Sequence, residues 1–271
     1  MVLFQTSTIK LHINKLPENS LLIIVDNTPN QNLKLNFEKS VKYLALMKNV
    51  GIAEAQNSGI KIAIEEDCSH IVFLDQDSLV QDDYVRKIIL EYERISKFLP
   101  NLFLLGPTVY NGRQNKEYKS TIHKDNYTEF DFIHRREIIS SGSCVSIKKI
   151  HNVGYLDSDL FIDYVDFEWC WRANKLGFQS GITPNIQINH FVGQEEYYIG
   201  KQLIIISSPI RYYYQARNFL WLLRRKYVPT IWKINTGIKI ILFTLTYPFK
   251  VKYWRQIYKY IYKGLIAGLK Y

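Results

Sequence analysis

The chain has 271 residues, of which 47% are hydrophobic, and it contains only 13 Gly and 8 Pro. This length and composition predict one large folded domain with an appendage, and they exclude a disordered chain. The net charge of +10 is unevenly placed, because all 25 acidic residues lie at or before Glu196, whereas 14 of the 35 basic residues follow it. A basic C-terminal segment of this kind points to an anionic membrane surface or to nucleic acid.

Strand and helix patterns alternate over the first hundred residues. Apolar runs predict strands at 21–26, 43–47, 71–74 and 102–105. Helical spacing of apolar residues lies between them, at 52–64 and 82–97. The alternation predicts a parallel sheet with helices on its faces, which is an α/β fold.

The pattern is looser in the next hundred residues. Residues 110–136 are polar and predict a long excursion on the surface. Strand character returns at 138–147 and again at 186–190. Between them, residues 160–177 read as a turn followed by a helix that ends at Gly177.

A carboxylate pair closes one of the apolar runs. Residues 71–74 are typical of a strand buried on both faces of a mostly parallel sheet, and Asp75 and Asp77 follow directly. In open α/β sheets, ligands bind outside the carboxyl ends of the strands. Two carboxylates there can hold a divalent cation, which in turn can hold a diphosphate. An isolated pair with this spacing is also common in solvated turns, so the spacing leaves both interpretations open.

A second acidic cluster, Asp163, Asp166 and Glu168, lies where the helix within 160–177 begins. Acidic residues in a first turn stabilise a helix without any chemistry. These three are interleaved with aromatic residues, and a carboxylate shielded from water has a raised pKa, which suits a general base. His190 ends the later strand, and an imidazole beside carboxylates suits Mn²⁺ or Mg²⁺.

Six short motifs resemble, in content and order, those of the family 2 glycosyltransferases, and most closely their bacterial rhamnosyltransferase branch. The motifs are IVDN at 24–27, NVGIAEAQNSG at 49–59, FLDQDS at 73–78, SGS at 141–143, LFIDYVDFEWCWR at 160–172 and SPIRYYYQARN at 208–218. Together they cover most of residues 21–220. The resemblance implies a GT-A fold, in which a Rossmann-like nucleotide-binding mixed sheet, flanked by helices, merges with an acceptor-binding half.

The resemblance also assigns roles to residues by position. Asp26 matches the acid that hydrogen-bonds the pyrimidine ring of a nucleotide-sugar donor. The other residues that match the donor pocket are Asn27, Asn49, Asn57, Ser141 and Gly142. Asp75, near the ribose, matches the metal site together with Asp77 and His190. Asp166 matches the catalytic base, and Glu168 is the alternative for that role.

The implied reaction is a single displacement with inversion that depends on Mg²⁺ or Mn²⁺. The rhamnosyltransferase likeness implies dTDP-β-L-rhamnose as donor and, as acceptor, a lipid-linked saccharide in bacterial surface polysaccharide synthesis of the O-antigen or capsule type. Family members usually open with a first strand, whereas this chain starts in what resembles the following helix. We therefore expect the first strand to be missing, and a catalytically impaired scaffold of the same fold is an alternative function.

The expected domains are a GT-A domain at 1–218 and a basic, amphipathic helical tail at 219–271. Within the first, residues 1–105 would bind the nucleotide sugar and residues 106–218 the acceptor. The longest apolar stretch of the tail, 240–249, is shorter than the roughly twenty residues that a spanning helix needs. Its aromatic and basic residues suit helices lying on an anionic leaflet. The alternative is a helical layer that covers the sheet.

The expected location follows from the cysteines and the N-terminus. Cys68, Cys144 and Cys170 are an odd number without metal-ligand spacing, which favours a reducing compartment, and no signal-peptide pattern is visible. We expect a cytoplasmic protein, peripheral at the inner face of the bacterial plasma membrane. The basic tail could also bind single-stranded nucleic acid. No RNA-binding or helix-turn-helix motif accompanies it, so we expect no nucleic-acid partner.

Overall fold

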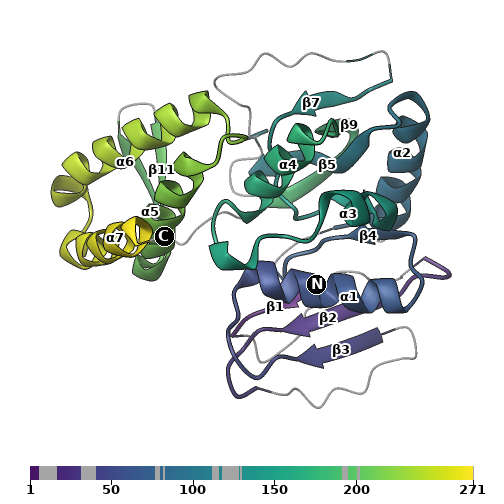
Figure 1. The fold of residues 1–271 in the computed structure, drawn as a ribbon, viewed down its shortest axis with the longest axis horizontal. Coiled ribbons are helices and arrows are strands. Elements are labelled where there is room, and N and C mark those ends of the chain that lie inside the picture. Colours follow the sequence, from purple (N-terminus) through teal and green to yellow (C-terminus); the bar gives the residue numbers. More distant parts are fainter. Residues whose placement is uncertain are drawn as a thin grey trace.

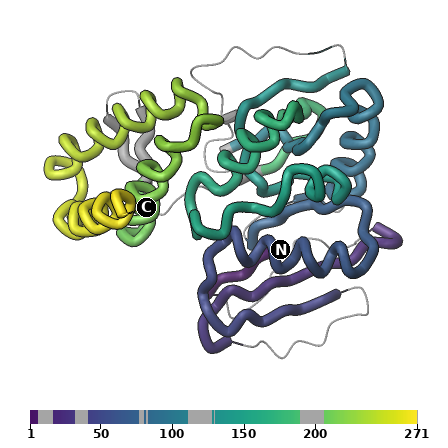
Figure 2. The backbone as a smooth tube through the Cα atoms, in the orientation of Figure 1, coloured from purple at the N-terminus to yellow at the C-terminus, as the bar shows by residue number. Residues whose placement is uncertain are grey.

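Two sheets formed by residues up to 190 meet one another, and three helices form a group at the C-terminal end of the chain (Figure 1). The computed structural model describes residues 1–5, 17–31, 41–76, 80–81, 83–111, 116–117, 128, 130–190, 195–199 and 202–270. Figure 2 follows the chain from the small sheet, through the larger one, to the C-terminal helices.

The smaller sheet is parallel and has three strands. Its central strand β2 (Leu22–Asp26) pairs with β1 (Val2–Leu3) on one side and with β3 (Val41–Ala45) on the other. The expectation of a missing first strand is therefore wrong at residues 2–3. The backbone explains why: the N–H groups of Val25 and Asn27 in the β2 segment donate to carbonyls of residues 1 and 3, so this short stretch is held in register.

The larger sheet is mixed. Its strands, in spatial order, are β4 (His70–Val72), β8 (Cys144–Ser146), β5 (Leu102–Asn111), β9 (Gln179–His190) and β7 (Ile133–Arg135), with β6 (Lys116–Glu117) on the far end of β5. Within it only β5 and β9 run parallel to one another as neighbours. The expectation of a mostly parallel surrounding for the run at 71–74 is thus wrong, because β8 turns back alongside β4 in the antiparallel direction.

Helices cover the larger sheet on both faces (Figure 1). On one face, α1 (Ile52–Glu65), α3 (Ile147–Val153) and α4 (Val165–Lys175) enclose a core centred on Trp169, whose ring packs edge-on against Phe103. On the other face lies α2 (Tyr84–Phe98). The predicted helices at 52–64 and 82–97 are confirmed. So is the end of α4, since Gly177 adopts a positive φ of 86° directly after it.

The C-terminal group consists of α5 (Pro209–Arg224), α6 (Thr230–Lys250) and α7 (Trp254–Leu269), preceded by the hairpin of β10 (Glu195–Ile199) and β11 (Gln202–Ile206). Helix α5 runs through the boundary expected at 218, and β5 runs through the one expected at 105. The division into domains stays a prediction. None of the described helices is both long enough and apolar enough to cross a membrane.

Close backbone contact holds α7 against α5. A Cβ at Gly264 would lie 2.3 Å from the Tyr213 carbonyl oxygen, so only glycine fits there. We expect Gly264→Ala to lower the free energy of unfolding by about 1–3 kcal/mol through overpacking. Gly237→Ala on α6 is the matched control, since its Cβ would meet Phe219 at an ordinary 3.4 Å. That control should be neutral or gain about 0.5–1 kcal/mol. Urea unfolding measures both, and an equal response of the two variants would contradict this packing.

Candidate active site

A turn at residues 140–143 is joined by hydrogen bonds both to the end of β4 and to the first turn of α4. The Phe73 N–H donates to the Ser143 carbonyl at 3.0 Å, and the Gly142 N–H donates to the Phe73 carbonyl at 2.7 Å. Gly142 has a φ of 77°, and a Cβ there would lie 2.6 Å from the Tyr84 hydroxyl. That hydroxyl donates to the Gly142 carbonyl at 2.7 Å. The turn is therefore held on one side by Phe73, which lies two residues before Asp75, and on the other side by Tyr84.

Asp166 lies in the first turn of α4 and is joined to the same turn. Its Oδ2 accepts a hydrogen bond of 3.1 Å from the Ser140 N–H. Burial raises the pKa of Asp166 to about 6; the Ser140 N–H opposes this shift, and the negative charge of Asp75 adds to it. A carboxylate with this pKa is ionised at neutral pH and still basic enough to accept a proton from a reacting hydroxyl.

The predicted metal ligands are placed unevenly. Asp75 follows β4 and forms a bridge with Val2 of β1, where the two sheets meet. His190 is the last residue of β9, paired in register with Asn111. Because β4, β5 and β9 run in the same direction, both residues lie toward one edge of the sheet. Asp77 lies outside the described residues, and so does the side chain of His190.

The described part of the chain thus gives a partial donor set for a cation. It contains no cluster of three or more His, Cys, Asp or Glu side chains that could hold a metal. Asp75 alone supplies a hard carboxylate oxygen, of the kind that Mg²⁺ and Mn²⁺ prefer. Its negative charge also contributes to the raised pKa of Asp166, after the larger effect of burial. Asp77 and His190 stay predicted ligands, because Asp77 and the side chain of His190 lie outside the described residues.

The predicted donor residues at the end of β2 form one network. The fully buried Asp26 carboxylate accepts from the Tyr43 hydroxyl at 2.7 Å and from the Thr28 N–H at 3.0 Å. The Asn27 side chain donates to the Asn49 Oδ1 at 3.0 Å and accepts from the Val50 N–H at 2.8 Å. The end of β2 is thereby tied to the start of α1.

Two predicted residues support other parts of the structure. The buried Asn57 amide donates to the Leu156 carbonyl and to the Ser158 hydroxyl, and its Oδ1 accepts from the Leu156 N–H. It therefore holds the segment that leads into α4. Glu168 is 1% exposed and is occupied by other partners, Arg172 at 2.9 Å and the Tyr227 hydroxyl at 2.6 Å. These contacts make Glu168 part of a buried ion-pair network and leave it remote from solvent.

Sequence reasoning missed the residues that hold Asp166 in place. It singled out Ser141 and Gly142, but it is the Ser140 N–H that bonds to Asp166, with the Ser140 hydroxyl accepting from Gln56 Nε2 at 3.0 Å. A backbone donor carries no signal in the amino-acid sequence. It also recognised the motif at 208–218 without giving it a role, although Arg211 of that motif pairs with Asp163 at 2.5 Å.

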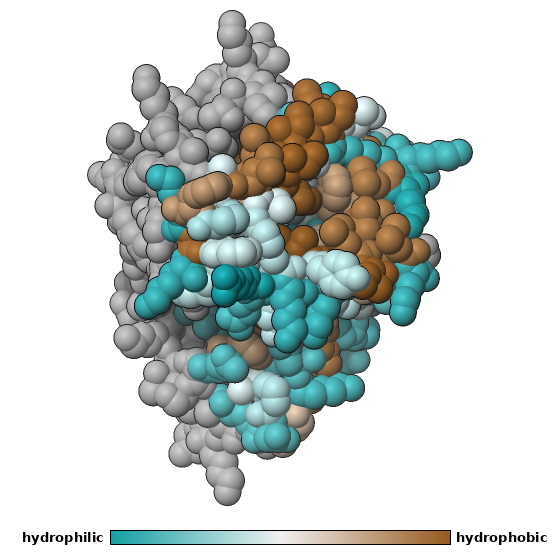
Figure 3. All heavy atoms as spheres, turned by 90° about the vertical axis from the view of Figure 1, so that its left-hand side faces the viewer, coloured by the Kyte–Doolittle hydropathy of each residue, from teal (hydrophilic) through white to brown (hydrophobic). Residues whose placement is uncertain are grey.

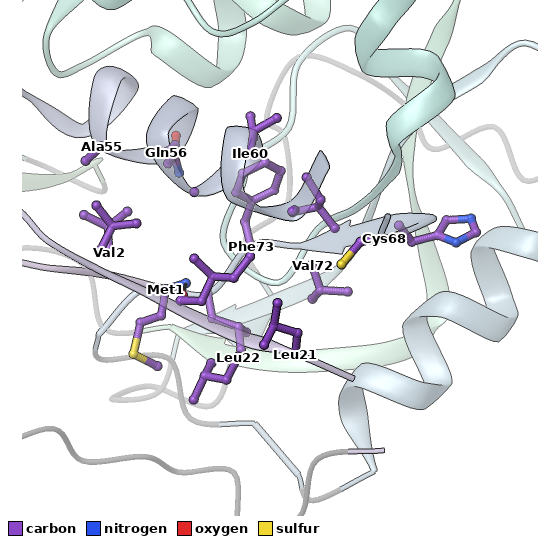
Figure 4. Close-up of a pocket in the computed structure, with 17 residues that line it drawn as sticks. Met1, Val2, Leu21, Leu22, Ala55, Gln56, Ile60, Cys68, Val72 and Phe73 are labelled. Atoms are coloured by element: carbon purple, nitrogen blue, oxygen red, sulfur yellow. Dashed lines mark hydrogen bonds between the residues drawn. The ribbon is translucent and has the colours of Figure 1, made fainter. Parts of the chain in front are cut away.

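A cavity of about 110 Å³ lies beside the predicted site and not within it. Its lining comes mostly from apolar residues of β2, α1 and β4, among them Leu22, Ile60 and Val72 (Figure 4). The cavity exists because β1 has two residues and pairs with only part of the five-residue β2. None of the predicted site residues lines it.

Comparison with known proteins identifies the family. Residues 8–150 match the model described as glycosyl transferase family 2. The protein named dTDP-rhamnosyl transferase RfbF, from Shigella flexneri, is 34% identical over 239 residues, which cover 84% of this chain and 78% of that protein. The chain belongs to glycosyl transferase family 2. It is therefore a glycosyltransferase, as the six motifs predict.

Solved structures agree on the fold. TarS of S. aureus has a TM-score of 0.54 at 13% identity, covering 93% of this chain but only 45% of the TarS chain. The mannosyltransferase PcManGT from Pyrobaculum calidifontis, solved with GDP-Man and Mn²⁺, has a TM-score of 0.53 at 10% identity, covering 99% and 86%. At these identities the likeness concerns the fold alone, and the predicted GT-A fold is confirmed.

The raised pKa of Asp166 lowers the free energy of unfolding of this glycosyltransferase at neutral pH. The folded state binds the Asp166 proton more tightly than the unfolded state does, so stability falls as the pH rises from about 4 to about 6. We expect Asp166→Asn to raise the free energy of unfolding at pH 7 by about 1–3 kcal/mol, because an amide cannot ionise but still accepts from the Ser140 N–H. Thermal unfolding between pH 4 and 8 measures this.

The matched control is Glu65→Gln, which changes an exposed carboxylate at the end of α1. It should leave the pH dependence of stability as it is in the unsubstituted protein. Identical curves for Asp166→Asn and Glu65→Gln would show that burial does not raise the pKa of Asp166.

Proposed function

We propose that this glycosyltransferase moves L-rhamnose from dTDP-β-L-rhamnose to a hydroxyl group of a lipid-linked saccharide, with inversion at the anomeric carbon. The relative RfbF, named a dTDP-rhamnosyl transferase, supports the donor. The position of Asp166 carries the chemical part of the proposal, because its pKa of about 6 and its closeness to Asp75 suit a base beside a diphosphate site. The product would enter surface polysaccharide of the O-antigen or capsule type.

In the proposed reaction, Asp166 accepts the proton of the acceptor hydroxyl while that oxygen attacks the anomeric carbon. The bond between this carbon and the diphosphate breaks in the same step, and the nucleoside diphosphate leaves. The Ser140 N–H orients the Asp166 carboxylate throughout. No covalent sugar–enzyme intermediate is needed, because one displacement from the opposite face gives inversion.

The donor would lie along the carboxyl ends of β2 and β4. Asp26, at the end of β2, would accept from the N–H of the pyrimidine ring, while Asn27 and Asn49 would shape the adjoining wall. The turn with Ser141 and Gly142 would border the sugar. Asn57 contributes indirectly, through the segment that it anchors.

A divalent cation would be held by Asp75, Asp77 and His190. When bound, Mg²⁺ or Mn²⁺ neutralises the negative charge that develops on the departing diphosphate. The positive charge of the cation would also offset the negative charges of its carboxylate ligands, and so reduce the repulsion between them and Asp166.

The donor and the metal can be tested together with purified protein. We expect slow turnover of dTDP-L-rhamnose in the presence of Mg²⁺ or Mn²⁺, faster than that of UDP- or GDP-sugars, and loss of most turnover in excess EDTA. Asp77→Ala should remove most activity with the fold intact, as measured by circular dichroism. Undiminished activity in EDTA or in the variant would contradict the metal assignment. Complete absence of turnover with every donor would favour a scaffold.

The choice of base can be tested by two near-isosteric substitutions. Asp166→Asn should lower kcat by about a hundredfold or more while donor binding changes little, because a positioned base contributes a factor of that size. The rate of the unsubstituted enzyme should fall as the pH drops through about 6, where Asp166 becomes protonated. Glu168→Gln should mainly reduce stability, since it weakens the bonds to Arg172 and Tyr227. The reverse pattern would make Glu168 the base.

We also propose that the protein is cytoplasmic and binds peripherally to the inner face of the plasma membrane, through α6. Apolar side chains on this helix recur every three or four residues and are exposed by 43–84% of their surface. They are Ile231, Ile234, Ile238, Ile241, Leu242, Leu245 and Phe249, and we call them the α6 stripe. Figure 3 shows apolar side chains gathered on this side of the molecule, bordered by hydrophilic ones.

The charge around the α6 stripe favours anionic lipid as its partner. No acidic residue follows Glu196, and the exposed lysines Lys239 and Lys250 lie on α6, with Lys252 just after it. Each basic side chain near an anionic surface contributes about 1 kcal/mol. The alternative interpretation, a helical layer that covers the sheet, fits only the start of α6, where Trp232 packs edge-on against Tyr164.

Flotation with liposomes tests this surface. The unsubstituted protein should float with anionic vesicles and dissociate in high salt, whereas a double variant, Ile241→Glu with Leu245→Glu, should remain in the soluble fraction. The matched control places glutamates at Leu90 and Phe98 of α2, which are 51% and 63% exposed on another part of the molecule. That control should still float. Equal flotation of all three proteins would contradict the proposal, and salt-sensitive binding to an oligonucleotide would favour a nucleic-acid partner.

A further inference from the structure

The segment that leads into α4 has an unusual backbone. After the short 3-10 helix η1 (Ser158–Leu160), three residues that are not glycine adopt positive φ angles: Phe161 at 64°, Asp163 at 65° and Tyr164 at 64°. Each such residue costs on the order of 1–3 kcal/mol and persists only where its surroundings hold it. Asp166 follows two residues later, so the strained segment sets the position of the proposed base.

One side chain of α5 holds most of this segment. Asn218 is fully buried, and its Nδ2 donates to the carbonyls of Leu160 at 2.9 Å, Ile162 at 2.8 Å and Asp163 at 3.2 Å. These carbonyls point in toward one amide because of the positive φ angles between them. Without Asn218, these carbonyls would lose this donor, and each buried carbonyl left without another partner would cost about 1–3 kcal/mol.

Two arginines of the same helix complete the contact. Arg217 donates to the Leu160 carbonyl at 3.0 Å and to the Asn218 Oδ1 at 2.8 Å, which fixes the orientation of the Asn218 amide. Arg211 forms an ion pair of 2.5 Å with Asp163, whose side chain is 8% exposed. The Tyr214 ring stacks on Phe161 at 4.5 Å between centroids.

The held segment in turn contacts the start of α1. The Phe161 carbonyl accepts from the Ile52 N–H at 2.7 Å. A Cβ at Gly51 would lie 2.6 Å from the same oxygen, so the two segments are as close as backbones can pack. Asn49, in the predicted donor pocket, accepts from the Gly51 N–H at 3.0 Å. The segment 160–164 is therefore linked to the predicted donor pocket as well as to the predicted base.

We propose that Asn218, assisted by Arg211, is a positioning residue for glycosyl transfer: it fixes the strained segment 160–164 and thereby places Asp166 against the acceptor hydroxyl. Asn218 acts through this segment and touches no reacting atom. The proposal rests on the proposed role of Asp166 as base. It gives a function to the motif at 208–218, which the sequence resemblance left without one.

The test compares kcat with donor KM in purified protein. Asn218→Leu is close in volume but has no donor, so the three carbonyls lose their hydrogen bonds from Nδ2, while Leu160 retains the one from Arg217. We expect kcat to fall by roughly ten- to a hundredfold, since a displacement of about 1 Å at a catalytic group has an effect of this size. Donor KM should stay within about twofold. Hydrogen exchange of peptides covering 160–168 should become faster. Arg211→Lys, which keeps the ion pair, should retain most of kcat, whereas Arg211→Leu should not.

A matched control separates positioning from general stability. Ile257→Ala creates a cavity between the C-terminal helices and lowers stability without touching 160–164. Assayed well below its melting temperature, it should keep the kcat of the unsubstituted protein. Equal losses of kcat in Ile257→Ala and Asn218→Leu would overturn the proposal. So would full kcat in Asn218→Leu when Asp166→Asn is inactive. Full turnover in Asp166→Asn would instead overturn the proposed base itself.

Discussion

The hydrogen bonds of the turn at 140–143 are the constraint on which the rest of the site depends. This turn is paired with Phe73 at the end of β4, supported by Tyr84 from α2, and bonded through the Ser140 N–H to Asp166 on α4. Three elements that lie far apart in the chain thus have one common point of attachment. The Ser140 N–H thereby fixes the Asp166 carboxylate relative to the end of β4, which Asp75 follows.

The same arrangement explains why the site is costly to fold. Asp166 is partly shielded by apolar surroundings and lies within the field of Asp75, so its ionised form is disfavoured in the folded state. The backbone just before it contains three residues with positive φ. Buried carboxylates and strained backbone persist only where neighbouring contacts offset them. Here the C-terminal helix α5 supplies those contacts through Asn218, Arg217 and Arg211.

The C-terminal helices therefore have two roles, which are to support the catalytic side and to present the α6 stripe. A domain boundary at residue 218 would fall inside α5 and divide this group of helices. Helix α5 supports the catalytic side through Arg211, Arg217 and Asn218, and α7 holds α5 through the close approach at Gly264. Helix α6 contributes Trp232 to the main core, where it packs against Trp171, and leaves the α6 stripe exposed. A helical group fixed to the core at one end and apolar at its outer face is consistent with the proposed binding to a membrane surface.

Much of the fold and part of the site could be predicted from the sequence. The apolar runs and helical spacing gave the positions of β2, α1, α2 and α4, because burial imposes the same periodicity wherever such elements pack. Sequence reasoning could single out Asp26, Asp75 and Asp166 as candidates, because the first two lie at or just after the end of a strand and the third at the start of a helix. The antiparallel pairing of β4 with β8 could not be predicted, since the direction of a neighbouring strand depends on how a distant part of the chain folds back.

The amino-acid sequence by itself determined the family, the positions of several helices and strands, and the residues available for chemistry. Only the tertiary structure decided which of them act together. Asp166 and Glu168 are two residues apart and look equivalent in the sequence, yet one accepts from a backbone N–H beside Asp75 and the other is enclosed by arginines and a tyrosine. Long-range packing made that distinction, because successive positions on a helix point to different surroundings and only those surroundings set the charge, the burial and the pKa of a carboxylate.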